Sequence, residues 1–178
     1  MRVSKVSSWI GCLLSGVLMV PIPDANAMEQ PPLSTGQTVY VPVYSSVLHG
    51  NFNDRGRPEQ ALLSSMLSVR NTDLHHAMTI TAVDYYDSTG QQIRRYLSKP
   101  QLLPHLATAD FFVENRDNKG GTGANFIVIW HAEQPIDQPM METVQVYHWG
   151  TQSQAFTSRG QVIHATNPNA KPEAPQKP

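Results

Sequence analysis

The sequence is almost without cysteine: Cys12 is the only one among its 178 residues. It also lacks an apolar run of the roughly 20 residues that a membrane-spanning helix needs. The longest such run, residues 9–20, is shorter and is followed by Pro21 and Pro23. A chain with one cysteine cannot form an internal disulfide, so we expect the fold to rely on its apolar core alone.

An excess of charge of one sign is absent as well. Lys and Arg number 13 against 14 Asp and Glu, and no basic stripe or polybasic run occurs. Nucleic acid and anionic membrane surfaces are therefore poor candidates as partners, because both attract clustered Lys and Arg. The sequence also has no Gly-x-Ser-x-Gly nucleophile elbow. We expect a protein that is not an enzyme and carries no cofactor.

The first 27 residues have the pattern of a secretory signal peptide. Arg2 and Lys5 form a short basic region, an apolar run follows, and residues 25–27 are Ala-Asn-Ala, a small-x-small cleavage site. We expect export to the periplasm or beyond the cell, with a mature chain that starts at Met28. An N-terminal membrane anchor is the alternative. Lipidation of Cys12 is not expected, because most of the apolar run follows it.

The rest of the chain has the patterns of short β-strands. Residues 38–44 alternate valine with other side chains, which predicts a strand with one buried face. Residues 78–96 predict a hairpin in which Asp87 begins the turn and Gly90 closes it with a positive φ. Residues 125–131 are apolar on both faces, which predicts a central strand. Further strands are expected at residues 61–72, 108–114, 142–149 and 155–163.

Turn signals about every 8–15 residues, with no convincing helix, favour an all-β fold. We predict an immunoglobulin-like β-sandwich of roughly seven to nine strands. The expected organisation is a signal peptide at 1–27, a linker at 28–36, the β-sandwich domain at 37–164 and a disordered, proline-rich tail at 165–178. Pro42 lacks a backbone donor, so its strand should lie at a sheet edge or leave the side of Pro42 unpaired.

Four segments of the chain share a pattern with a known family. They are Ser-Val-Arg-Asn-Thr-Asp at 68–73, Val-Asp-Tyr-Tyr-Asp at 83–87 with Gly90, Arg-Arg-Tyr-Leu at 94–97 and Gly-Gly-Thr-Gly-Ala-Asn-Phe-Ile-Val at 120–128. In these segments the chain resembles the uncharacterised bacterial envelope family of domains of unknown function 3124, over residues 36–163. The resemblance implies an exported envelope domain and no particular activity, because the family has none assigned.

Six charged residues are the candidate binding residues. They are Arg70, Asp73, Asp84, Asp87, Arg94 and Arg95. We expect them to gather at one end of the hairpin pair, because strand ends and loops on a rigid sandwich commonly carry function. The partner would be an envelope protein or a glycan. The alternative is a network of surface ion pairs that contributes little to stability.

Histidine and methionine suggest an alternative function, the binding of copper or zinc in the periplasm. His75 and His76 are adjacent, and Met140, Met141 and His148 lie close in the sequence. Such soft ligands suit copper in an oxidising compartment. Strand alternation places Met141 and His148 on opposite faces, however, so we assign no metal ligands.

Two other chemistries have weaker support. Asp84 with Asp87, or Glu114 with Asp117, would suit a polysaccharide hydrolase with paired carboxylates, although carboxylates in turns usually serve as caps. The glycine-rich segment 120–123 would suit an anion-binding loop, but such a loop precedes a helix, and here a strand is expected. Our leading hypothesis is therefore a non-enzymatic binding or accessory module of the cell envelope.

Overall fold

The computed structural model describes residues 31–165, which form twelve β-strands and no helix. The predicted signal peptide and nearly all of the predicted tail lie outside the described residues. The strands are β1 (Ser34–Pro42), β2 (Ser46–His49), β3 (Glu59–Leu62), β4 (Ser64–Arg70), β5 (Met78–Tyr86), β6 (Gln92–Arg95), β7 (Gln101–Leu103), β8 (Thr108–Val113), β9 (Asn125–Ile136), β10 (Met140–Trp149), β11 (Gln152–Arg159) and β12 (Gln161–Ala165).

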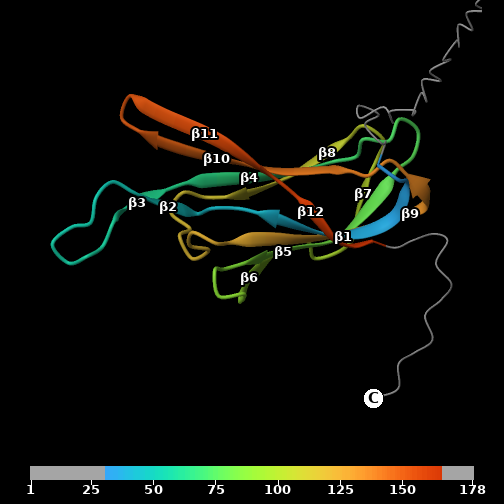
Figure 1. Ribbon diagram of the computed structural model, residues 1–178. Coiled ribbons are helices and arrows are strands. Elements are labelled where there is room, and N and C mark those ends of the chain that lie inside the picture. Colours follow the sequence, from blue (N-terminus) through green and yellow to red (C-terminus); the bar gives the residue numbers. More distant parts are fainter. Residues whose placement is uncertain (1–30, 166–178) are drawn as a thin grey trace, which may run out of the picture. The chain divides into compact units, whose positions relative to one another are not determined.

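These strands form two sheets and a ribbon, and every pairing is antiparallel (Figure 1). The six-stranded sheet has the order β12-β1-β9-β5-β6, with β7 also paired to β5. The four-stranded sheet has the order β11-β10-β4-β8, and the ribbon is β2-β3. The all-β class is confirmed, while the immunoglobulin-like arrangement stays a prediction.

The core lies between the two sheets and is built from their inward faces. Val39 and Val41 of β1 face it, as the valine alternation predicts, and Leu67 of β4 meets them from the other sheet. Trp130 and Phe126 of β9 are the largest apolar side chains that are fully buried. Burial of one such side chain stabilises the fold by roughly 1.5–3 kcal/mol, so this core is the main source of stability.

Strand β9 is central, as predicted, because it lies between β1 and β5. It continues to Ile136, past the predicted end of its strand at His131. Strand β1 is not an edge strand, since β12 pairs with it as far as Tyr40. The pairing with β12 ends before Pro42, so the absence of an N–H at Pro42 costs no hydrogen bond to β12.

The structure has more strands than the roughly seven to nine predicted. The stretch 45–59, where no strand was expected, contains β2 and the start of β3. The stretch 155–163, predicted as one strand, belongs to β11 and β12, which lie in different sheets. Gly160 permits the change of sheet, because a Cβ there would lie 2.8 Å from Cγ1 of Val39. Strand β1 begins at Ser34, within the predicted linker.

The predicted hairpin is confirmed as β5 and β6. Gly90 has a φ of +83°, and its N–H donates to the carbonyl of Asp87 at 3.0 Å. The Asp87 carboxylate accepts N–H bonds from Thr89 and Gln91 at 2.8 and 2.9 Å. A bulge lies at Thr81, where the register with β9 shifts between Ile80 and Ala82.

Candidate functional site

A cleft of about 690 Å³ lies between the β2–β3 ribbon and the β10–β11 hairpin. Figure 1 shows the ribbon and the hairpin tip projecting on the same side of the molecule. Val47, Ala61 and Leu63 give the cleft an apolar wall. Tyr147 of β10 and Phe156 of β11 add two aromatic rings from the opposite side. The cleft is thus concave and combines apolar and aromatic side chains with polar ones, as small-ligand sites often do.

The register of β10 and β11 explains why aromatic rings reach the cleft. Gln145 pairs with Phe156, and Tyr147 pairs with Gln154, so these four side chains share one face of the sheet. Gln145 is fully buried, whereas Phe156 is 40% exposed. The inward face of the sheet therefore runs from the core into the cleft. The ring of Phe156 meets the ring of Tyr44 edge-on at 5.8 Å.

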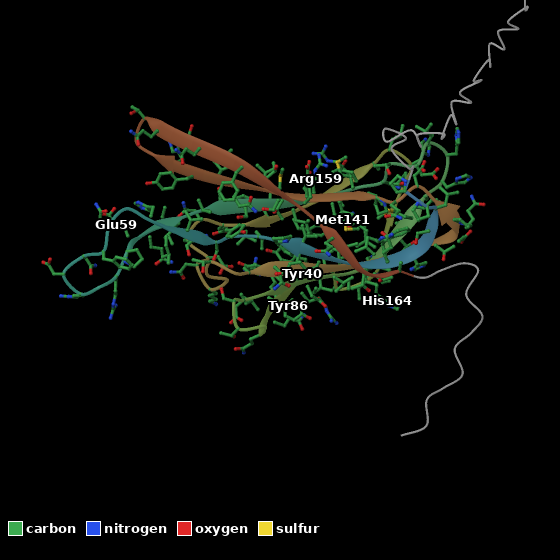
Figure 2. All side chains as sticks on the ribbon, in the orientation of Figure 1. Tyr40, Glu59, Tyr86, Met141, Arg159 and His164 are labelled. Atoms are coloured by element: carbon green, nitrogen blue, oxygen red, sulfur yellow. The ribbon has the colours of Figure 1, made fainter. Side chains whose placement is uncertain are left out.

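The cleft carries almost no charge. None of its lining residues is Asp, Glu, Lys or Arg, and the polar ones are mainly amides and hydroxyls: Thr151, Gln152, Ser153 and Gln154. His49 is also in the lining, with Nδ1 3.7 Å from Glu59 Oε2 on the ribbon (Figure 2). Such a surface suits an uncharged ligand held by hydrogen bonds and aromatic contact. It offers no carboxylate pair for a hydrolase.

A second pocket, of about 500 Å³, brings together three of the seven histidines: His75, His76 and His131. His76 Nδ1 lies 3.1 Å from Asp73 Oδ1, which leaves Nε2 as the other ring nitrogen to face outward. Nevertheless, no group of three or more His, Cys, Asp or Glu within residues 31–165 is arranged to hold a metal ion. Met141 is buried in the core (Figure 2) and His148 is exposed, so these two do not meet.

Asp73, a predicted binding residue, organises the loop between β4 and β5. Its Oδ1 accepts the N–H groups of His75 and His76 at 2.8 Å, and Oδ2 accepts that of Asp137 at 3.2 Å. Burial alone would raise the pKa of Asp73. The backbone hydrogen bonds and the charge of His76 outweigh that effect and lower the pKa to about 2. The carboxylate is therefore ionised at neutral pH and occupied within the fold.

The structure does not gather the six predicted binding residues into one patch. Arg70 ends β4 and Asp73 follows it near the start of β5, whereas the other four lie at the far end of the β5–β6 hairpin. Most of them have a partner. Arg95 donates two bonds to the buried Asp84, at 2.9 and 3.0 Å. The Thr89 hydroxyl and two N–H groups hold the pKa of Asp87 below its usual range.

The two remaining arginines are also paired. Arg94 Nη2 lies 3.0 Å from Asp117 Oδ2, and Arg70 Nη2 lies 3.2 Å from Glu142 Oε1. Each arginine is about half exposed, with 46–47% of its side-chain surface accessible. These two arginines therefore form separate, partly exposed ion pairs.

The glycine-rich segment 120–123 is fastened to the hairpin turn. The carbonyl of Gly120 accepts bonds from the N–H and Oγ of Ser88, and the carbonyl of Gly121 accepts them from the N–H and Oγ of Ser45. A Cβ at Gly120 would overlap Oη of Tyr85, which is fully buried and whose pKa is raised by that burial to about 12. The segment is thus a packing element of the fold.

Sequence reasoning missed the cleft, because no residue that lines it was a candidate. A signal does exist in residues 140–159, where both strands of the hairpin are rich in uncharged polar residues and still carry aromatic side chains. An aromatic side chain on an exposed, polar strand indicates a contact surface. That pattern indicates Tyr147 and Phe156 as candidate contact residues.

A family model described as "Protein of unknown function (DUF3124)" matches residues 36–163. No curated protein matches the sequence. One solved structure, named "Crystal Structure of Thermotoga maritima 1070", is similar over 75% of this chain and 97% of that chain, with 7% sequence identity and a TM-score of 0.41. This likeness is too low to support an inference. The described residues contain no helix with the length and apolarity to cross a membrane.

Proposed function

Since this chain belongs to the family described as "Protein of unknown function (DUF3124)", we propose that it is an exported, non-enzymatic binding or accessory module of the cell envelope. We further propose that its sheets form an immunoglobulin-like sandwich and that the cleft between β2–β3 and β10–β11 holds the ligand. Export is supported by the signal-peptide pattern of residues 1–27.

The cleft is the single observation that carries this proposal. It presents two aromatic rings and several amide and hydroxyl groups, and no Asp, Glu, Lys or Arg is in its lining. Such a surface can hold a neutral ligand in place, and its one titratable side chain other than Tyr147, His49, lies beside Glu59 with no second acid or base in the lining. We therefore assign binding and not catalysis.

The test is capture of partners from native envelope extract by the folded chain. Tyr147→Ala removes an aromatic wall of the cleft, whereas Tyr86→Ala removes a half-buried tyrosine on β5 outside its lining. We expect Tyr147→Ala to lower capture about tenfold and Tyr86→Ala to leave it nearly unchanged. Equal capture by both variants and the unaltered chain would remove the cleft from the functional account.

Metal binding is the second candidate function, and one observation favours it: His75, His76 and His131 line one pocket, with His76 held by Asp73. A carboxylate that orients a histidine in this way is common around protein-bound metals. Calorimetric titration with copper and zinc, repeated on His76→Ala, tests it. Binding weaker than about 1 μM, roughly −8 kcal/mol, would eliminate this candidate.

A further inference from the structure

The sheets end in edge strands of very different character. The edges are β11 and β8 in the four-stranded sheet, and β12 and the pair β6 and β7 in the six-stranded sheet. An edge strand presents unpaired N–H and C=O groups, so proteins usually shorten, charge, bend or cover it. An edge strand that lacks all of these protections is a candidate site for a partner to add a strand.

The other edges are shorter, charged or interrupted, and the ribbon strands β2 and β3 have four residues each. Strand β8 has six residues, carries Asp110, and the carbonyl of its Phe112 accepts a bond from Tyr96 Oη at 2.9 Å. Strand β6 has four residues, including Arg94 and Arg95, and β7 has three. Strand β12 has five residues, and its pairing with β1 is interrupted by a register shift after Thr38.

Strand β11 has none of these protections. It is eight residues long and pairs with β10 without a shift, from Gln152 to Arg159. Its only charged residue is Arg159, at its very end (Figure 2), and it has no proline. All its residues except Ser158 are exposed. Among residues 31–165, β11 has β10 as its sole strand partner.

The cleft adjoins this open edge. Thr151 of the hairpin turn and the three consecutive β11 residues Gln152 to Gln154 line it, together with Phe156. Side chains of an extended strand alternate between two faces, so a lining of consecutive residues brings the main chain itself to the cleft. Backbone groups and a side-chain pocket therefore lie together, which is the combination that strand addition uses: the backbone gives affinity and the pocket gives specificity.

We propose that the free edge of β11 accepts an extended polypeptide segment as an added strand, with an uncharged side chain of that segment in the cleft. This inference rests on the proposed binding function and names its ligand class as polypeptide. The absence of charge in the cleft favours an uncharged side chain, because no Asp, Glu, Lys or Arg lines it. A charged side chain placed there would lose its hydration without gaining a partner.

The probe is a phage-displayed library of random peptides of eight residues, the length of β11, selected on the full chain. Enriched peptides should alternate apolar and polar residues, and one of them, labelled with a fluorophore, serves for affinity measurements. Thr157→Lys places a charge on the β11 edge outside the cleft lining, and Thr108→Lys makes the same change on β8. We expect Thr157→Lys to weaken binding about tenfold and Thr108→Lys to change it less than about twofold.

Amide hydrogen exchange supplies the decisive readout. Added peptide should slow exchange at every second residue of 152–158, where the N–H points away from β10 and gains a strand partner, and should leave β8 unchanged. No enriched peptide, equal effects of the two lysine variants, or protection elsewhere would overturn the inference. Slow exchange of β11 in the free chain, together with concentration-dependent dimers, would also overturn it and assign the edge to a second copy.

Failure of this inference and failure of the proposed function have different signatures. Envelope capture that depends on Tyr147, with a glycan as the captured ligand and no protection of β11, removes strand addition and keeps the binding cleft. Peptide addition at β11 with envelope capture that is indifferent to Tyr147 keeps the edge and removes the cleft as the site of native binding.

Discussion

The β5–β6 end of the molecule and the β10–β11 hairpin differ in how fully their polar groups are occupied. At the β5–β6 end, Ser88 binds Gly120 and Gly123, Arg94 meets Asp117, and Arg95 meets Asp84. In the hairpin, β11 has one paired side and one open side beside a cleft. The charged residues of the β5–β6 end have internal partners, whereas the uncharged surface beside β11 is the ligand surface that we propose.

This difference indicates a structural role for the segments that resemble the family. Val83 to Asp87 and Gly120 to Val128 lie mostly at the occupied end, where they position one another. Substitutions there should therefore act mainly on stability. Substitutions in the β10–β11 hairpin should act mainly on binding.

The largest loss of stability should follow Gly120→Ala. Its new Cβ would overlap Oη of the buried Tyr85 and lie 2.8 Å from Cβ of Ala124. We expect a loss of about 3 kcal/mol and a fall of the thermal midpoint on the order of 10 °C. Gly150→Ala at the hairpin tip is the control: its φ is +56° with open space around it, so it should cost about 1 kcal/mol. Similar midpoints for the two variants would contradict the packing role of Gly120.

The next effect is a loss of stability in acid due to Asp73. Its pKa in the folded chain, about 2, lies below its ordinary value of 3.8, so ionisation favours the folded state at higher pH. That contribution, roughly 2 kcal/mol, is complete above about pH 5 and disappears as the pH falls towards 2. Denaturant melts of the unaltered chain and Asp73→Asn should differ most near neutral pH and converge near pH 2. A constant difference across this range would show that Asp73 acts through shape and not charge.

A smaller effect separates two ion pairs. Arg95→Ala leaves the buried Asp84 without its two charge-assisted bonds, which should cost about 1–2 kcal/mol. Arg70→Ala breaks a single contact with Glu142, whose side chain is more exposed than that of Asp84, and should cost less than about 1 kcal/mol. Urea unfolding of both variants measures the difference. The reverse order would mean that burial of the carboxylate does not decide the strength of these pairs.

Local pattern was sufficient for much of the fold. Alternation of valines placed Val39 and Val41 in the core, the Asp87–Gly90 turn chemistry gave the hairpin, and an apolar run gave the central β9. The division of residues 155–163 into two strands escaped prediction. It depends on Gly160 passing close to Val39, a contact between distant parts of the sequence.

The candidate site could not be predicted from the sequence for the same physical reason. The cleft forms where the ribbon, from one part of the chain, faces a hairpin that begins at residue 140. Sheet order and register decide that meeting, and neither is encoded in any single segment. His131 likewise joins His75 and His76 only because β9 pairs with β5. The isolated charges were the candidates that the sequence offered, and in the fold each of them has a partner within the chain.

The most direct test of the difference between the two regions is envelope capture by Tyr147→Ala and Arg94→Ala, measured side by side on folded protein. Arg94 represents the charged residues of the β5–β6 end, and Tyr147 represents the cleft. We predict capture close to that of the unaltered chain for Arg94→Ala and a reduction of about tenfold for Tyr147→Ala. Loss of capture with Arg94→Ala and normal capture with Tyr147→Ala would place the binding surface at the hairpin turn and contradict this account.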